Sequence, residues 1–109
     1  MSQFDVHHNT GRHRASIPYV LIVQSALFDK SRRRVAVPLV ALEQLAGSAP
    51  LLSSPINPVF DIQGRQVIMN PLEIVSVGVE QLGEPVTSLA GQGDSIIAAL
   101  DELFSRAWG

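Results

Sequence analysis

Hydrophobic residues recur at helical spacing in one stretch near the end of the chain, residues 94–109. Gly91 and Gly93 interrupt the chain before this stretch, and Asp94 or Ser95 can accept hydrogen bonds from the free N–H groups of a first helical turn. The apolar positions share one stripe, made of Ile96, Ile97, Leu100, Leu103, Phe104 and Ala107. The pattern predicts an amphipathic C-terminal helix with one buried face.

The preceding chain has the shorter periodicity of β-strands. Polar and apolar residues alternate in 3–7 and again in 73–80, so that Phe4 and Val6 share one face of a first strand. Residues 19–24 are apolar and β-branched without alternation, which is typical of a central strand covered on both faces. Further strands are expected at 35–39, 59–62 and 66–69.

Glycine and proline mark the ends of these strands. The segment Gln63-Gly64-Arg65 predicts a hairpin, because its glycine can adopt a positive φ. Pro38 cannot donate a ladder hydrogen bond, which places it at an edge or an end of its strand. Residues 40–46 allow a short helical turn, 47–55 favour an ordered loop, and 84–86 are expected to lead into the helix.

Five or so short antiparallel strands followed by one helix define the expected fold class. It is mainly β, a small twisted barrel or sheet with the C-terminal helix packed on it. The 109 residues suffice for a single domain, 1–109, with one modest core. A hydrophobic content of 46% beside 17% charged residues suggests a surface covered by a second subunit, so we expect a homodimer.

Charge and cysteine content exclude several classes of protein. The formal net charge of −2 argues against a general binder of polyanions, and no apolar run approaches the roughly 20 residues of a membrane span. The chain contains no cysteine, and its start, Met-Ser-Gln-Phe-Asp, lacks an export signal. We therefore expect a cytoplasmic protein without a membrane partner.

Patterns that indicate catalysis or metal binding are weak. His7, His8 and His13 are the imidazoles of the chain, and the adjacent pair points to opposite faces of a strand. We interpret them as solvated side chains rather than metal ligands. No serine stands in a Gly-x-Ser-x-Gly turn, and Asp101 and Glu102 are neighbours on an exposed helix face. The sequence predicts no enzyme, no metal and no cofactor.

Three features indicate an interaction surface instead. Leu27 and Phe28 are bulky and apolar, yet they stand in what reads as a connection. The arginines at 32–34 either lie on a solvated strand entry or meet an acidic partner. Trp108 precedes Gly109 at the C-terminus, where its indole either covers the core or anchors a partner.

An ordered set of short segments resembles the CcdB family, the toxins of bacterial toxin–antitoxin operons. The segments are Gln3-Phe4, Val23-Gln24-Ser25, Arg34-Val-Ala-Val-Pro-Leu39, Val77-Gly78-Val79-Glu80, Glu84-Pro85-Val86 and the Ile-Ile-Ala-Ala-Leu-Asp run of the helix. The resemblance extends nearly from end to end with similar spacing. It implies a homodimer with an SH3-like barrel core, a small extra sheet and a C-terminal helix.

The resemblance also implies a function without catalysis. Family members bind the A subunit of DNA gyrase across the dimer axis and trap the complex in which DNA is cleaved. A disordered segment of the cognate, CcdA-like antitoxin wraps the toxin and neutralises it, and operator DNA is bound only through that complex, in autoregulation of transcription. The gyrase contacts of the family match Ser25, Leu27, Phe28, Asp101, Phe104, Trp108 and Gly109. The antitoxin contacts match Asp5, His7 and Arg34.

The C-terminal tail departs from the family pattern. Members often end in Trp-Gly-Ile or a similar tail directly after the residue that matches Phe104, whereas Trp108 here comes three positions later. On a helix this shift rotates the indole by about 300° and moves it roughly 4.5 Å along the axis.

Two interpretations stay open. In a gyrase-directed toxin, Trp108→Ala should abolish growth arrest without affecting folding. The alternative is an SH3-like barrel binding module, either a divergent, non-toxic homologue or a protein linked to nucleic acid through its arginines. A nucleic-acid-linked module would bind naked DNA with a steep salt dependence.

Overall fold

The computed structural model describes residues 2–45 and 54–105; the features expected at 46–53 and 106–109 lie outside the described residues. Its centre is an antiparallel sheet with the strand order β4-β5-β3-β2-β1-β7, and β6 pairs with β3 beside this path. The strands are β1 (Asp5–His8), β2 (Tyr19–Ile22), β3 (Arg33–Ala41), β4 (Val59–Ile62), β5 (Arg65–Met69), β6 (Val75–Gly78) and β7 (Pro85–Ser88).

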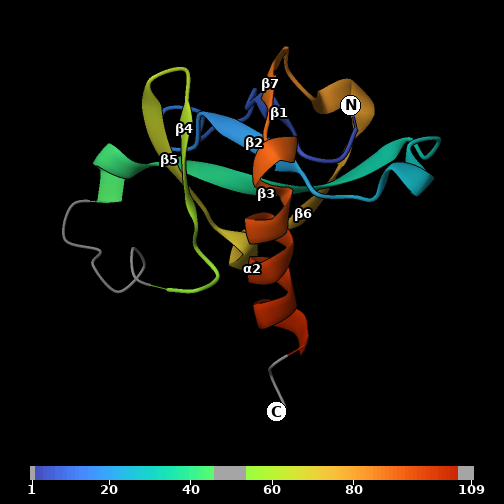
Figure 1. Ribbon diagram of the computed structural model, residues 1–109. Coiled ribbons are helices and arrows are strands. Elements are labelled where there is room, and N and C mark those ends of the chain that lie inside the picture. Colours follow the sequence, from blue (N-terminus) through green and yellow to red (C-terminus); the bar gives the residue numbers. More distant parts are fainter. Residues whose placement is uncertain (1, 46–53, 106–109) are drawn as a thin grey trace.

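The sheet curls into a half-barrel, and the helix α2 (Gly93–Ser105) follows it at the C-terminal end (Figure 1). Single turns of 3-10 helix join the strands: η1 (Ala26–Phe28), η2 (Leu42–Leu45), η3 (Pro71–Glu73), η4 (Val79–Gln81) and η5 (Ala90–Gln92). The expected fold class, mainly antiparallel β with one C-terminal helix, is confirmed.

Strand β3 connects three neighbours and corrects the expectation about Pro38. It pairs with β6 through residues 33–36 and with β5 through 39–41 on one edge, and with β2 through 36–39 on the other edge. The carbonyl of Pro38 accepts from the N–H of Asn70 (3.0 Å), and the nitrogen and carbonyl of one strand residue point to the same side. The proline nitrogen therefore faces the gap between the β6 and β5 pairings. No ladder bond is lost, so the strand continues to Ala41.

The prediction of a buried central run is confirmed in β2. Tyr19, Leu21 and Ile22 are buried, and β1 and β3 pair with this strand on its two edges. The core on one face of the sheet contains Val6, Tyr19, Leu21, Val23, Val37, Leu39, Phe60, Ile62, Val67, Met69, Leu89, Ile96 and Ala99. These side chains come from most strands and from α2, so the core attaches the helix to the sheet.

Two local predictions in the middle of the chain are confirmed. β4 and β5 form the expected hairpin, and both residues of its turn have positive φ, 54° at Gln63 and 86° at Gly64. This is the combination that a two-residue type I′ turn needs. The short helical turn allowed at 40–46 is present as η2.

The N-terminal strand and the segment before the helix differ from expectation. β1 begins at Asp5 rather than at residue 3, because Phe4 has a positive φ of 70° and leaves the extended conformation. The segment expected to lead into the helix contains a further strand, β7, which pairs with β1. It has little β-periodicity of its own, and it is a strand because β1 offers a free side.

Helix α2 is buried only over its first part. It begins at Gly93, where an added Cβ would lie 2.8 Å from the ring of Phe4, so only glycine allows this close approach. Ile96 and Ala99 are buried, whereas Phe104 is 62% exposed. The expectation of one buried face along the whole stripe is therefore wrong, because the helix extends beyond the sheet (Figure 1).

Candidate protein-binding site

An apolar groove of about 560 Å³ lies between α2 and the connection from β2 to β3. Its lining is Val23, Gln24, Ser25, Phe28, Ser31, Val35, Ile74, Leu100 and Phe104. We call it the α2 groove. One wall is thus the C-terminal half of α2, and the other is the loop of residues 25–33, which we call the 25–33 loop.

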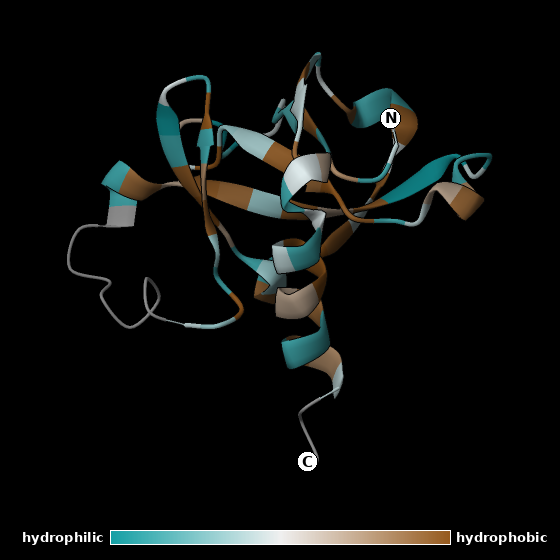
Figure 2. Ribbon diagram, in the orientation of Figure 1, coloured by the Kyte–Doolittle hydropathy of each residue, from teal (hydrophilic) through white to brown (hydrophobic). Residues whose placement is uncertain are grey.

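Two large apolar side chains of the 25–33 loop are exposed beside this groove. Leu27 is 88% exposed and Phe28 is 61% exposed. Figure 2 shows the η1 turn that carries them as a hydrophobic segment next to the hydrophilic start of β3. The turn itself is well formed, since the hydroxyl of Ser25 accepts from the N–H of Leu27 (3.2 Å). Bulky hydrocarbon on a well-formed turn marks a surface that a partner can cover.

The side chain of Gln24 binds both ends of this loop. Its Nε2 donates to the carbonyls of Phe28 and Arg33 (3.1 Å each), and its Oε1 accepts from the N–H of Val35 (3.1 Å). Gln24 was not among the residues expected in the site. A lone glutamine after a strand carries no signal in a sequence, because its role depends on backbone groups that the fold brings around it.

Arg34 supports the same loop from inside the protein. It is 5% exposed, and its guanidinium donates to the carbonyls of Asp29 (2.6 Å), Arg33 (2.9 Å) and Ser31. Arg33 instead bonds the hydroxyl (3.0 Å) and carbonyl (2.7 Å) of Ser76. Arg34 is therefore buried, whereas Arg32 and Arg33 remain exposed, so a solvated entry to the strand describes only the first two arginines of the run.

The structure brings together most of the residues matched to gyrase contacts. Ser25, Phe28 and Phe104 line the α2 groove, and Leu27 is on its loop. Asp101 is exposed on α2 but does not line the groove. Trp108 and Gly109 lie outside the described residues.

The residues matched to antitoxin contacts occupy two places. Asp5 Oδ2 accepts from the N–H of Ser2 (2.8 Å), the hydroxyl of Ser2 donates to Asp29 (2.9 Å), and Asp29 in turn accepts from Arg34. Asp5 and Arg34 are thus connected through two residues. His7 lies on the β7 side of the sheet, where its Nδ1 is 2.9 Å from the carbonyl of Gly83.

The burial of His7 corrects the interpretation of a solvated imidazole. His7 is 3% exposed, and its Nε2 is buried without a hydrogen-bond partner in the described part of the chain. The cause is β7, which covers the side of β1 that the sequence left open. His8 is exposed, and its ring lies 5.6 Å from that of Tyr19.

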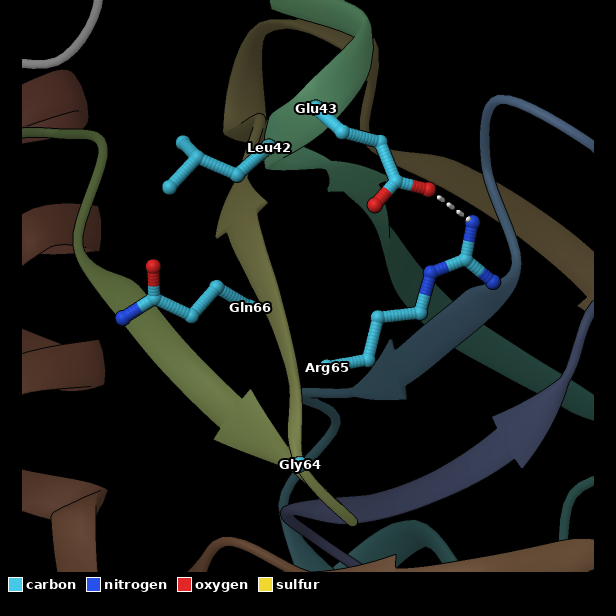
Figure 3. Close-up of a pocket in the computed structure, with 5 residues that line it drawn as sticks. All are labelled: Leu42, Glu43, Gly64, Arg65 and Gln66. Atoms are coloured by element: carbon cyan, nitrogen blue, oxygen red, sulfur yellow. Dashed lines mark hydrogen bonds and ion pairs between the residues drawn. The ribbon is translucent and has the colours of Figure 1, made fainter.

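A second hollow, of about 570 Å³, lies between η2 and the β4–β5 turn. Figure 3 shows its lining residues, with Arg65 and Glu43 pointing toward one another across a 2.9 Å ion pair. The two charges neutralise each other at a partly exposed position, where such pairs are weak. None of the expected site residues lines this hollow, so the α2 groove is the better candidate.

Neither a cluster of metal-ligating side chains nor a membrane-spanning helix is found in the described ranges. Within residues 2–45 and 54–105, no group of three or more His, Cys, Asp or Glu side chains could hold a metal ion. None of the helices in the same ranges is long and apolar enough to cross a bilayer. What the described residues offer is an apolar groove with exposed hydrophobic side chains beside it.

The fold is a small antiparallel half-barrel with an apolar groove between its C-terminal helix and one loop. The family model described as CcdB protein matches residues 3–105. The chain belongs to the CcdB family, which places it among the toxins of toxin–antitoxin systems.

The solved structures include a similar fold. An "Endoribonuclease in complex with its cognate antitoxin from Mycobacterial species" superposes with a TM-score of 0.75 at 17% identity, covering 100% of this chain and 99% of that one. At this identity the likeness shows the fold alone. No curated protein sequence matches the chain significantly.

Proposed function

We propose that this protein is a toxin that binds the A subunit of DNA gyrase through the α2 groove and traps the complex in which DNA is cleaved. The observation that carries the proposal is the apolar groove lined by the exposed side chains of Phe28 and Phe104, with exposed Leu27 next to Phe28 on the same turn. All three match gyrase contacts of the family. Hydrophobic anchors of this kind provide most of the binding energy of protein interfaces.

The proposed mechanism needs no catalytic group. A protein that binds the cleaved gyrase–DNA complex more tightly than the resealed one shifts the equilibrium toward the cleaved state. The toxin would therefore act by binding alone, without a metal or cofactor. The cleavage of DNA would remain the reaction of gyrase.

The assembly and its regulation belong to the same proposal. We expect a cytoplasmic homodimer, in which exposed apolar residues away from the groove, such as Leu72 and Val75, are available to a second copy. An antitoxin would neutralise the toxin through the region of Asp5, His7 and Arg34. Operator DNA would be bound only through the toxin–antitoxin complex. Sedimentation of the purified protein tests the dimer, and a monomer at micromolar concentration would contradict it.

The direct test adds purified protein to gyrase, plasmid DNA and ATP, and measures linear DNA after detergent and protease treatment. Wild-type protein should accumulate linear DNA. Phe28→Ala should require about 30-fold more protein for the same effect, the loss expected for a side chain worth about 2 kcal/mol. Val59→Ala, which shortens an exposed side chain on β4 outside the groove, should behave like wild type.

Cleavage of RNA is the competing activity, because a structural neighbour is named an endoribonuclease. Incubation of the protein with total RNA, without gyrase, separates the two functions. The proposal expects intact RNA together with linear plasmid in the gyrase assay. Degraded RNA and unchanged plasmid would replace the gyrase toxin with a ribonuclease.

A further inference from the structure

We infer that Gln24 is a positioning residue of the α2 groove, which fixes the 25–33 loop so that Leu27 and Phe28 meet the partner in one conformation. The identity of that partner rests on the proposed function. The order of the loop does not depend on it. Neither the composition of the chain nor its family resemblance assigns a role to Gln24.

The amide of Gln24 is placed to close the loop. Its two donated bonds reach the carbonyls of Phe28 and Arg33, which stand at opposite ends of the turn. Its accepted bond comes from the N–H of Val35 on β3, so the amide is also anchored to the sheet. One side chain thereby binds three backbone groups, and for the N–H of Val35 it is the partner that the strand does not supply.

Arg34 completes this arrangement from the opposite side. It binds the carbonyls of Asp29, Ser31 and Arg33, so the two side chains share the Arg33 carbonyl. Between residues 28 and 33, four backbone carbonyls are held by side chains rather than by a strand partner. Gln24 and Arg34 thus add side-chain bonds from both sides to the loop's own turn hydrogen bonds.

The loop needs such support because its own side chains do not pack. Leu27 and Phe28 point into solvent, and no buried residue lies in η1. A loop that becomes ordered only on binding loses affinity, by about tenfold for each residue that must be fixed. A loop that Gln24 orders before binding does not lose this affinity. This is the physical reason for the role that we infer for Gln24.

The test uses two substitutions of Gln24 that retain the length of the side chain. Gln24→Met removes all three hydrogen bonds, and Gln24→Glu keeps an acceptor for Val35 while removing both donated bonds. Gln66→Glu is the matched control, since Gln66 is exposed on β5 and does not line the α2 groove. Calorimetric titration with the gyrase A subunit should show about tenfold weaker binding for both Gln24 variants and no change for the control.

A double-mutant cycle distinguishes positioning from a direct contact or a general loss of stability. If Gln24 acts through Phe28, Gln24→Met should weaken binding much less in a Phe28→Ala background than in the wild type. Equal effects in both backgrounds would overturn the inference. Gln24→Met should also unfold at a somewhat lower temperature, because it loses three hydrogen bonds, and this loss of stability should be similar in both backgrounds while the loss of binding is not.

Hydrogen exchange tests the loop without any partner. Amide exchange in residues 26–33 should become faster in Gln24→Met, while exchange in β2 and β5 should stay as in wild type. Unchanged exchange in 26–33 would overturn the inference even if gyrase binds. If wild-type protein does not bind gyrase, the proposed function fails, and faster exchange confined to 26–33 would still support the positioning role.

Discussion

The loops at the two ends of strand β2 differ in exposed hydrocarbon. The loop that enters β2, residues 9–18, exposes Arg12, His13 and Arg14 and, among its described residues, no large hydrophobic side chain; we call it the cationic loop. The 25–33 loop, which leaves β2, also exposes basic side chains, but it adds Leu27 and Phe28. Both are shaped by bonds from side chains to backbone. Asn9, for example, donates to the carbonyl of Ile17 (2.7 Å) and accepts from the N–H of Gly11 (2.9 Å).

This difference supports the proposal that the 25–33 loop meets the partner. Exposed charge needs no explanation in a protein dissolved in water, but exposed hydrocarbon on an ordered loop costs solubility. The end with the hydrocarbon adjoins an apolar groove. We therefore propose the protein interface at the 25–33 loop and expect the cationic loop to be solvated.

The largest effect is expected from a substitution in the core of β2, the strand that connects the two loops. Leu21 is fully buried in the middle of β2, so Leu21→Ala should lower the free energy of unfolding by about 2–5 kcal/mol. Urea denaturation followed by circular dichroism measures it. Thr87→Ala, an exposed position on β7, serves as control, and a Leu21→Ala variant as stable as that control would contradict the core described above.

A smaller loss is expected at the cationic end alone. Asn9→Ala removes both side-chain bonds and should cost about 1–2 kcal/mol of stability. Hydrogen exchange should become faster in residues 10–17 and remain unchanged in 26–33. Faster exchange in both loops would show that the two ends are not independent.

The helical wall of the groove provides the next test. Phe104→Ala should weaken gyrase binding by about tenfold and leave stability within about 0.5 kcal/mol of wild type, because the ring is mostly exposed. Titration calorimetry and urea denaturation measure the two quantities. A large loss of stability without a loss of binding would mean that Phe104 belongs to the fold rather than to the interface.

The smallest effect is expected from removing charge at the other end. The double variant Arg12→Gln/Arg14→Gln should change neither trapping of cleaved DNA nor, beyond about 0.5 kcal/mol, stability. The gyrase assay at low and moderate salt measures this. If the variant lost trapping mainly at low salt, the cationic loop would contribute to the interface and the comparison would have to be abandoned.

Several elements could be predicted because their signals are local. The β4–β5 hairpin follows from a glycine between two apolar runs, and the start of α2 follows from helical spacing after Gly93. Burial of β2 follows from its continuous apolar run. Residues matched through the family resemblance, such as Ser25, Phe28 and Phe104, do meet at one groove.

Other features could not be predicted because they depend on neighbours distant in the chain. Pro38 is tolerated inside β3 only because two different strands meet beside it. β7 becomes a strand because β1 offers it hydrogen bonds, and in doing so it buries His7. The sequence does not indicate which strands lie beside Pro38 or that β7 pairs with β1.

The sequence by itself determined the fold class, the positions of the hairpin and the helix, and the family, because periodicity and turn chemistry act over a few residues. Only the tertiary structure decided what the polar side chains do. Gln24 and Arg34 are ordinary residues until folding surrounds them with the carbonyls of the 25–33 loop. A hydrogen bond depends on the geometry of both partners, and the second partner is placed by the fold.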